Sequence, residues 1–543
     1  MIKIIKILIF IIFLTISIIA HSQDWISSHH SYSTGNIKIT EAIYDENNDR
    51  YLVTGNYSDS IYFGVSDTLV ADNGNEGSFL VSYDRNYNAK WVYDIDGESK
   101  EIFSSLALDK DGNIYLAGMF RSTSCNFGSD TTLSTDGLGD IYLSKFNSNG
   151  ELVWVNHVGR NSDFQLSTGL YVDDSDNILL SINYVNSITI EDGRIDTTFN
   201  SGASNSFAAV LTKLNKNGTI IKDNIYNIQT DGIANIYGIG SYSGSYYISG
   251  RFKGTVNFSS NSYTSTSSTS DIFLFKTDSE FNDQWIRRST GNGDDYPGTT
   301  TYDKNGNIYL SGYFSSTNFQ ADSTSSQKSD IVYNHGSNDI FILKYNKNGN
   351  LNWTKSFGSS QDDWARKIDQ KGNIFYLTGY YEDDIEIGNE VLTNQGGSDF
   401  FIGTFDSEGN GLRAFDLNQQ GNNDESGLTI DIAPDNTVYT GGYFKSSSIG
   451  IGDTTFNLNG TRDIFLGKFT SELAATFSEI QQPSCNGASD GKLVVKPEFG
   501  VAPYTYTWTP DVSSDSTAEN LSAGTYEVTV EDSEGSTTTI SHD

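Results

Sequence analysis

DKNGNIYLSGYF at residues 303–314, followed by NDIFILKYNKNGNLNWTKSFG at 338–358, is the fullest copy of a pattern that occurs seven times in this chain. Its anchors are Asp-x-x-Gly-Asn, an apolar strand ending in Gly-aromatic-aromatic, a variable stretch, Asp-Ile-Phe-Leu, Asn-Gly and Trp. The seventh copy stops at DIFLGKF (463–469) without a Trp strand, whereas QDWISSH (23–29) is a Trp strand with nothing before it. Because the two ends complete each other, the repeat predicts a closed ring.

Each copy contains four short strands, named a to d in chain order. In the fullest copy they are expected at 299–303, 307–314, 339–345 and 350–357. Asn-Gly tolerates the positive φ of a tight hairpin, so it is expected to join a to b and c to d. The copies recur about 62 to 69 residues apart, which suits four strands and one long loop. The third copy (173–184 and 206–218) is the weakest, because it lacks the Gly and the Trp.

The repeat predicts an all-β fold, a seven-bladed β-propeller with four-stranded blades. The N-terminal strand closes the last blade, which removes a sheet edge that would otherwise stay unpaired. The pattern resembles the bacterial β-propeller repeat abbreviated SBBP, with units of the form DxxGNxYxxGxF…GxDIFxxKxxxxGxxxW, over residues 24–470.

The repeat ends near residue 474, and a different pattern follows. CNGASDGKLVV (485–495), APYTYTW (502–508) and NLSAGTYEVTVEDSEG (520–535) alternate apolar and polar residues, as half-buried strands do. These segments resemble the repeat of the gliding-motility adhesin SprB, which implies a small immunoglobulin-like β-sandwich. Ser536 stands where that family often has a Cys. The expected domains are a signal peptide at 1–22, the propeller at 23–472 and the sandwich at 473–543.

The N-terminus has the features of a secretory signal peptide. Lys3 and Lys6 precede an apolar run at 7–19 and the small-x-small segment 20–22, so cleavage is expected before Gln23. No later segment is apolar enough to cross a membrane, and no C-terminal sorting domain is recognisable. The chain is expected to be secreted or on the cell surface. Its two cysteines, Cys125 and Cys485, fall in different predicted domains, so no disulfide framework is expected.

The charge balance excludes one class of partner. Asp and Glu number 69 against 34 Lys and Arg, a formal charge of −35. Nucleic-acid binding requires clustered cations to meet the phosphates, so a nucleic-acid partner is not expected. A solvated extracellular surface explains the acidity without any ligand, and a monomer is expected.

Asp-rich turns offer one candidate site. Asp109, Asp111 and Asp303 lie in Asp-Lys-x-Gly-Asn segments that are similar to the opening of a calcium loop. Their Gly comes too early and no Glu follows at the twelfth position. Asp and Asn also cap hairpin turns without any metal, so both interpretations stay open.

The long b–c loops and the inter-blade d–a loops are expected on one face of the ring, where a rigid scaffold presents variable loops to a ligand. Acidic–aromatic pairs recur there. Alternatively, each acid caps the start of strand a and each aromatic packs between blades, since the pairs follow the repeat. The candidate ligand-binding residues are Asp163, Phe164, Asp295, Tyr296, Asp363, Trp364 and Asp424.

No catalytic motif stands out. The sequence has no His-Glu-x-x-His and no Gly-rich phosphate loop. The expected function is therefore that of an exported, non-enzymatic binding or adhesion protein for an extracellular protein or glycan, with no cofactor other than possible calcium. The alternatives are a propeller-fold glycan hydrolase or lyase, whose paired carboxylates spacing alone does not identify, and a structural component of a surface assembly.

Overall fold

A computed structural model describes most of the chain between Trp25 and His542. The expected signal peptide, Cys485, Asp163 and Phe164 lie outside the described residues. The described ranges are 25–63, 68–71, 76–97, 99, 101–127, 131–135, 139–160, 165–191, 196–259, 261–321, 331–420, 423–470, 473–484, 487–498, 503–533 and 535–542.

The structure is all-β, as expected. Within the described ranges, the one helical element is the 3-10 turn η2 (Thr266–Ser268). No described helix has the length and apolar character needed to cross a membrane. The second and third strands of each repeat are buried on both faces, which explains their nearly continuous apolar sequences. In β30 (Asp339–Tyr345), for example, all seven residues are buried.

The repeats fold into antiparallel units of four strands, seven of them in the described residues, each with the pairing order a-b-c-d. The a strands are β2 (Ile37–Asp45), β8 (Glu101–Leu108), β14 (Gln165–Val172), β20 (Ile233–Tyr242), β26 (Asp295–Tyr302), β32 (Trp364–Lys371) and β39 (Glu425–Ile432). The b strands are β3 (Arg50–Ser58), β9 (Ile114–Phe120), β15 (Ile178–Val185), β21 (Ser245–Lys253), β27 (Ile308–Phe314), β33 (Ile374–Tyr381) and β40 (Thr437–Phe444).

The remaining two strands of each unit lie farther out. The c strands are β6 (Glu76–Asp84), β12 (Asp140–Phe146), β18 (Phe207–Leu214), β24 (Asp271–Asp278), β30, β36 (Asp399–Phe405) and β43 (Asp463–Thr470). The d strands are β7 (Ala89–Gly97), β13 (Leu152–Arg160), β19 (Ile220–Thr230), β25 (Asp283–Ser289), β31 (Leu351–Phe357), β37 (Gly411–Phe415) and β1 (Trp25–Ser33). The expected bounds of strand c in the fullest copy are confirmed, whereas strand a begins earlier than expected, at Asp295.

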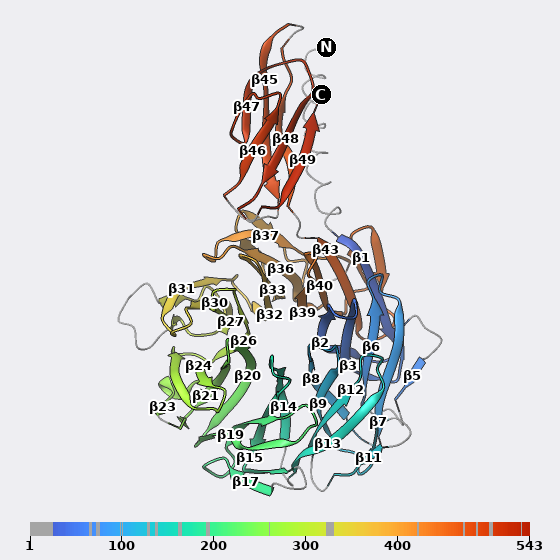
Figure 1. The fold of residues 1–543 in the computed structure, drawn as a ribbon, viewed down its shortest axis with the longest axis vertical. Coiled ribbons are helices and arrows are strands. Elements are labelled where there is room, and N and C mark those ends of the chain that lie inside the picture. Colours follow the sequence, from blue (N-terminus) through green and yellow to red (C-terminus); the bar gives the residue numbers. More distant parts are fainter. Residues whose placement is uncertain are drawn as a thin grey trace.

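The units follow one another around a ring in sequence order (Figure 1). Each a strand contacts the a strand of the next unit, and β39 of the last unit contacts β2 of the first. The a strands therefore form the inner wall of the ring, and the apolar clusters lie between neighbouring units.

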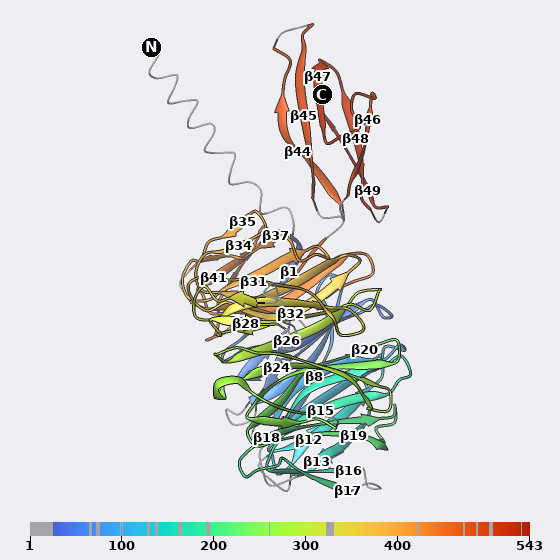
Figure 2. The same cartoon turned by 90° about the vertical axis from the view of Figure 1, so that its left-hand side faces the viewer.

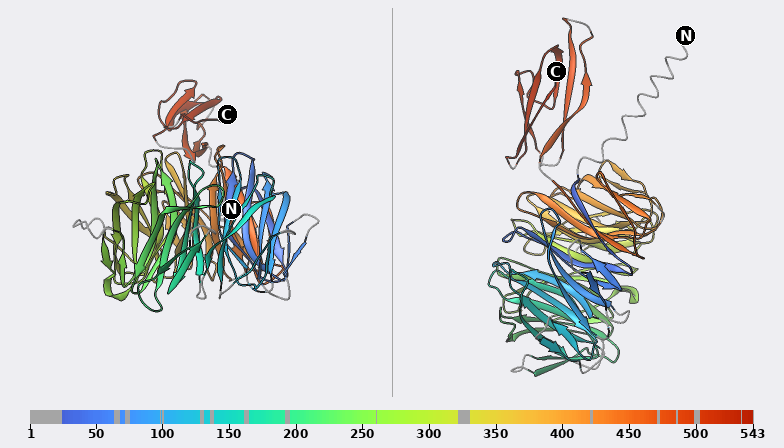
Figure 3. Two further views of the ribbon diagram at one scale, coloured as in Figure 1. Left: turned by 60° about the horizontal axis from the view of Figure 1, so that its bottom comes forward. Right: turned by 90° about the vertical axis from the view of Figure 1, so that its right-hand side faces the viewer.

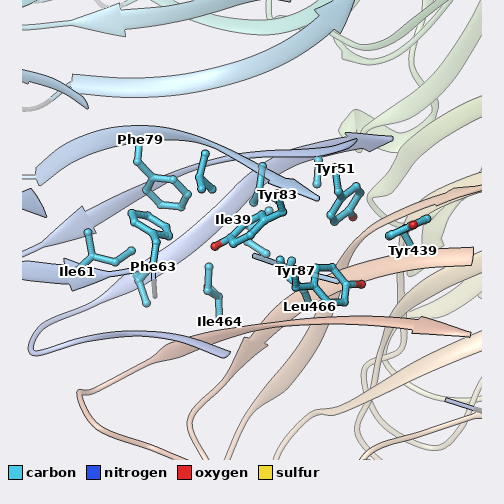
Figure 4. Close-up of a cluster of buried hydrophobic side chains, with 14 of the residues drawn as sticks. Ile39, Tyr51, Ile61, Phe63, Phe79, Tyr83, Tyr87, Tyr439, Ile464 and Leu466 are labelled. Atoms are coloured by element: carbon cyan, nitrogen blue, oxygen red, sulfur yellow. The ribbon is translucent and has the colours of Figure 1, made fainter. Parts of the chain in front are cut away.

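The expected closure by the N-terminal strand is confirmed. β1 pairs antiparallel with β43, in a register that places Trp25 opposite Phe469. The first and last units also share one apolar cluster, in which Ile464 and Leu466 of β43 pack with residues of β2, β3 and β6 (Figure 4). β43 consequently has a hydrogen-bonded neighbour on both sides, β40 and β1.

A β-bulge in every a strand explains the repeated Gly of strand b. The bulge lies opposite the same position of strand b in all seven units. A Cβ at Gly312 would lie under 3.0 Å from both the Tyr296 carbonyl oxygen and the Phe341 ring. In the weak third copy, Ile182 replaces this Gly and Val210 replaces the aromatic ring opposite it. A small residue on b and a large one on c are thus exchanged for two of intermediate size.

The long b–c loops are not free loops. Each carries a two-stranded hairpin, and several of these hairpins extend the sheet of the preceding unit: β4 pairs with β1, β10 with β7, β16 with β13 and β22 with β19. They thereby cover outer edges that would otherwise be unpaired. The hairpin strands are β4 (Ser60–Tyr62), β5 (Thr68–Val70), β10 (Cys125–Phe127), β11 (Thr131–Leu133), β16 (Ser187–Glu191), β17 (Asp196–Asn200), β22 (Thr255–Asn257), β23 (Ser262–Thr264), β28 (Asn318–Gln320), β29 (Ile331–Tyr333), β34 (Ile385–Ile387), β35 (Glu390–Leu392), β41 (Ser448–Ile451) and β42 (Thr454–Asn457), with β38 (Asn418–Gln420) beside β41.

The C-terminal segment forms two three-stranded antiparallel sheets that enclose their own core. Trp508 packs in that core, and its indole N–H donates to the Asp515 carbonyl oxygen at 2.9 Å. This body stands beyond the edge of the ring (Figures 2 and 3). Its strands are β44 (Ala474–Gln481), β45 (Ser489–Glu498), β46 (Thr505–Thr509), β47 (Thr517–Ser522), β48 (Tyr526–Glu531) and β49 (Thr537–His542).

Candidate functional site

A pocket of about 500 Å³ lies at the centre of the ring and is lined by residues of all seven a strands. Each strand contributes residues close to its C-terminal end, next to the turn into strand b. The pocket therefore lies at the tight-hairpin end of the ring, opposite the long b–c and d–a loops. Its volume is in the range of pockets that hold small molecules.

Two carboxyl groups, those of Asp369 on β32 and Asp431 on β39, face each other in this pocket. Main-chain amides fix both groups: Gln370 N–H donates to Asp369 Oδ1 at 2.8 Å, and Tyr44 N–H donates to Asp431 Oδ2 at 2.7 Å. Thr301 Oγ1 donates to Asp369 Oδ1 at 3.4 Å. The two carboxyl groups also hydrogen-bond to each other. Such a bond requires a shared proton.

Burial raises the pKa of Asp369, and the charge of the neighbouring Asp431 raises it further. Burial also raises the pKa of Asp431. The two groups titrate together, with one proton between them. Two close carboxyl groups cannot both ionise readily in a site that is poor in water, which is the usual origin of such a pair.

An ion pair lies beside the two carboxyl groups. Lys367 Nζ is 2.7 Å from Glu41 Oε1, which comes from β2, and the two side chains are 25% and 22% exposed. Burial acts against the Lys367 charge, but the nearby carboxylates, Glu41 first, raise its pKa overall. Lys367 therefore stays protonated and adds one fixed positive charge to the pocket wall.

Three tyrosines complete the wall: Tyr44, Tyr171 and Tyr302. The hydroxyl groups of Tyr171 and Tyr302 are engaged, by Ser241 Oγ at 3.2 Å and Thr300 Oγ1 at 3.3 Å. Burial raises the pKa of the Tyr171 hydroxyl. The Tyr44 ring stacks on Tyr439, with ring centroids 4.9 Å apart, and Arg85 lies over it, so the aromatic surface left for a ligand is that of Tyr171 and Tyr302.

The arrangement has the components of acid–base chemistry: a protonated carboxyl group, a carboxylate and a cation in one pocket. A general acid or base is effective when burial and neighbouring charges bring its pKa toward the working pH. Perturbed carboxyl groups in a cleft are typical of functional sites.

Sequence reasoning missed Asp369 and Asp431, although a signal was present. They occupy the same position of strand a in their units. At this position each acid lies opposite the strand-b residue that comes three places before the repeated Gly. The other five units place Ile43, Ala107, Tyr171, Gly240 and Thr301 there. Two acids at a position that otherwise carries apolar or small polar residues break the repeat, and such a break is what a unique site predicts.

The structure places two of the expected acids of the long-loop face, Asp295 and Asp363, inside the protein. Asp295 is fully buried and accepts hydrogen bonds from Ser316 N–H at 3.3 Å and Ser316 Oγ at 2.8 Å. Asp363 is also fully buried and accepts from the amides of Ser359 and Glu382. Burial raises the pKa of Asp295 to about 8 and that of Asp363 to about 7. Both bind loop backbone, as the capping interpretation requires.

The accompanying aromatic residues stack on one another. Tyr313 lies between Tyr296 and Trp364, with ring centroids 4.9 and 4.0 Å away. Arg366 covers Trp364, with its guanidinium carbon 4.7 Å from the ring centroid. The stack crosses the boundary between the fifth and sixth units. Asp424 is not part of it, because its carboxylate pairs with Lys445 Nζ at 2.6 Å.

The Asp-rich turns do not converge on a common point. Asp109 Oδ1 accepts from the amides of Asp111 and Asn113 at 3.1 and 2.9 Å, which is a side-chain cap of the turn. Asp303 makes the corresponding bonds in the equivalent turn of the fifth unit. Within the described ranges, no group of three or more His, Cys, Asp and Glu side chains is placed to hold a metal ion.

Comparison with known proteins identifies the C-terminal body. The family model described as the SprB repeat matches residues 478–513, which confirms the resemblance for that segment. The SBBP resemblance of the ring stays a prediction. No curated protein sequence matches the chain.

Several solved structures are distantly similar to the chain. A lignostilbene dioxygenase of Pseudomonas brassicacearum is 9% identical, with a TM-score of 0.36, over 82% of this chain and 93% of the other. A luciferin-regenerating enzyme is 12% identical, with a TM-score of 0.30, over 65% and 86%. A variant of the Synechocystis apocarotenoid oxygenase is 9% identical, with a TM-score of 0.26, over 96% and 94%. At these values the likeness assigns no activity to this chain.

The expectation of a non-enzymatic binding or adhesion protein that presents its long-loop face is wrong. In the chain itself, the b–c loops form hairpins on neighbouring sheets, and the central pocket opens at the other end of the ring. The physical reason is that variable loop sequences here serve to cover sheet edges.

Proposed function

We propose that this chain is an enzyme that carries out proton transfer on a small molecule in the central pocket. The observation that carries the proposal is the Asp369–Asp431 pair in the pocket, in which burial raises both pKa values and the charge of Asp431 further raises that of Asp369. Asp369 would act as the general acid and Asp431 as the general base. Lys367, held by Glu41, would stabilise negative charge that develops on the substrate.

The proposal is tested with a probe that needs only a base in a pocket, 5-nitro-1,2-benzisoxazole. A carboxylate removes the proton on C3, the N–O bond breaks, and a coloured cyanonitrophenolate is released. Relative to free acetate, a positioned base should accelerate this opening by roughly 10²-fold or more. The rate should rise with pH as the pair loses its shared proton.

Matched variants decide the outcome. Asp369→Asn with Asp431→Asn should abolish the acceleration, whereas Asp511→Asn with Glu519→Gln replaces two exposed carboxyl groups of the sandwich and should leave the rate unchanged. Equal rates for the wild type and the first double variant would refute the proposal.

We further propose the finer architecture. Residues 23–472 would form a seven-bladed β-propeller of SBBP-type repeats, and residues 473–543 an immunoglobulin-like sandwich. The contact of β39 with β2 and the β1–β43 pairing support the first assignment, and the SprB match supports the second. The chain would be exported to the cell exterior as a monomer. N-terminal sequencing of the exported protein should begin at Gln23, and its mass in solution should be that of one chain.

A further inference from the structure

The lining of the central pocket carries more acidic than basic groups. Lys367 is its one basic residue and is already paired with Glu41. Arg50, which lies behind the lining, binds Asp45 with Nε 2.8 Å from Oδ2 and offsets that charge. The shared proton offsets one more, and negative charge still remains. The acidic residues of the lining are Glu41, Asp45, Glu46, Asp369 and Asp431.

Aromatic surface accompanies this charge. Tyr44, Tyr171 and Tyr302 come from three different a strands and line the same pocket. The faces of aromatic rings carry the negative part of the ring quadrupole, so they attract cations and repel anions. Tyr44 already stacks on Tyr439 and meets Arg85, so the rings of Tyr171 and Tyr302 and the surplus carboxylates are the features that favour the same kind of ligand, on independent grounds.

We propose that the central pocket takes a small organic cation, a molecule that carries an ammonium group, as its ligand. The inference rests on the proposed function, because it names the class of substrate for the same pocket. The ammonium group would lie between the carboxyl pair on β32 and β39 and the tyrosine rings. The remainder of the molecule would occupy the rest of the roughly 500 Å³. An anionic ligand would meet a lining in which carboxylates outnumber cations.

Choline and its uncharged carbon isostere, 3,3-dimethylbutan-1-ol, provide a matched pair of probes. The two have nearly the same shape, so a difference in affinity reports the charge alone. Titration calorimetry on the full chain at physiological salt should show choline binding at least roughly tenfold more tightly than the isostere, as expected for a partly desolvated cation beside aromatic rings. Equal affinities for choline and the isostere, or no binding of choline, would overturn the inference regardless of the results with the variants.

Variants locate the binding. Asp369→Asn with Asp431→Asn should weaken choline binding at least roughly tenfold. The matched control, Asp511→Asn with Glu519→Gln, tests attraction by the acidic surface in general and should bind choline like the wild type. If the control weakens binding as much as the pocket variant does, the cation is bound by the overall charge and the inference fails.

A second change guards against misfolding of the carboxyl variant. Tyr171→Leu leaves every pocket charge in place and should weaken choline binding about threefold or more, with little effect on the isostere. Unchanged choline binding in this variant would contradict the contribution of the aromatic surface. The benzisoxazole probe is uncharged, so its turnover reports the carboxyl base independently of any cation binding. If the protein turns over this probe but binds choline no better than the isostere, the organic-cation inference is refuted and the proposed function is retained.

Discussion

Replacing Gly312 with alanine tests why each unit repeats a Gly in strand b. The added methyl group would lie under 3.0 Å from the Tyr296 carbonyl oxygen and from the tip of the Phe341 ring. The carbonyl is part of the bulged β26 backbone and cannot rotate away, so the cost should lie at the upper end of the range for overpacked cores, about 3 kcal/mol. The free energy of unfolding, measured by urea denaturation with tryptophan fluorescence and circular dichroism, should fall by that amount.

A double variant separates the two clashes. Phe341→Val alone should cost about 2 kcal/mol, because it removes part of a buried ring. Combined with Gly312→Ala, it removes the clash with the ring, so the double variant should be more stable than the sum of the single effects by at least about 1 kcal/mol. Gly524→Ala has no atom within 4 Å of the added methyl group and should be nearly neutral. Additive effects of the two core changes would refute the pairing of Gly with the aromatic ring.

Three further results are expected. Burial raises the pKa of Asp295 to about 8 and of Asp363 to about 7, whereas both ionise near pH 4 when unfolded, so folding binds protons and the free energy of unfolding should fall as pH rises from about 5 to about 8. Urea midpoints at both pH values check this, and Asp295→Asn should flatten the change. Trp25→Ala removes an edge contact with Phe469 (ring centroids 5.6 Å apart) and should cost about 2 kcal/mol, with faster proteolysis of β1 as a second readout. Arg50→Met leaves a buried carboxylate unpaired and should lower the free energy of unfolding by about 3 kcal/mol in the same denaturation assay.

The strands and turns could be predicted because their signals are local. Asn-Gly marks the tight hairpins, where Gly306 and Gly349 have φ values of 77° and 79°. The Asp-Ile-Phe-Leu segments are buried on both faces and read as short apolar runs. The Trp strand before the first copy had no strand c of its own to pair with, and the last copy had a strand c without a Trp strand. Each of these inferences needed only the residues of one repeat or the two ends of the array.

The b–c hairpins could not be predicted, because their partners belong to another repeat. β10 and β11 are three residues each, and β10 is held by β7 of the preceding unit. Strands this short carry almost no periodic signal. Their expected role as free variable loops was wrong for that reason.

The pocket escaped prediction for a different reason. Glu41 and Lys367 form an ion pair across 326 positions of the chain because the ring closes, and Asp369 meets Asp431 across the boundary between the sixth and seventh units. In the sequence, nothing distinguishes the three acids Glu41, Asp369 and Asp431 from the other 66 Asp and Glu residues. Alignment of the seven copies on the bulge, rather than on the Gly-aromatic anchor, would have shown where the acids interrupt the repeat.

The position of β43 has a mechanical consequence. The sandwich follows directly from the C-terminal end of this strand, so a pull on the sandwich loads β43 along its length. β43 is hydrogen-bonded on both sides, to β40 and β1, and ladder bonds run perpendicular to the strands. Tension therefore shears two ladders at once instead of peeling one strand from an edge. The hydrogen bonds from β1 thus stabilise the strand to which the sandwich is attached. Without β1, a much smaller force would pull β43 out of its sheet.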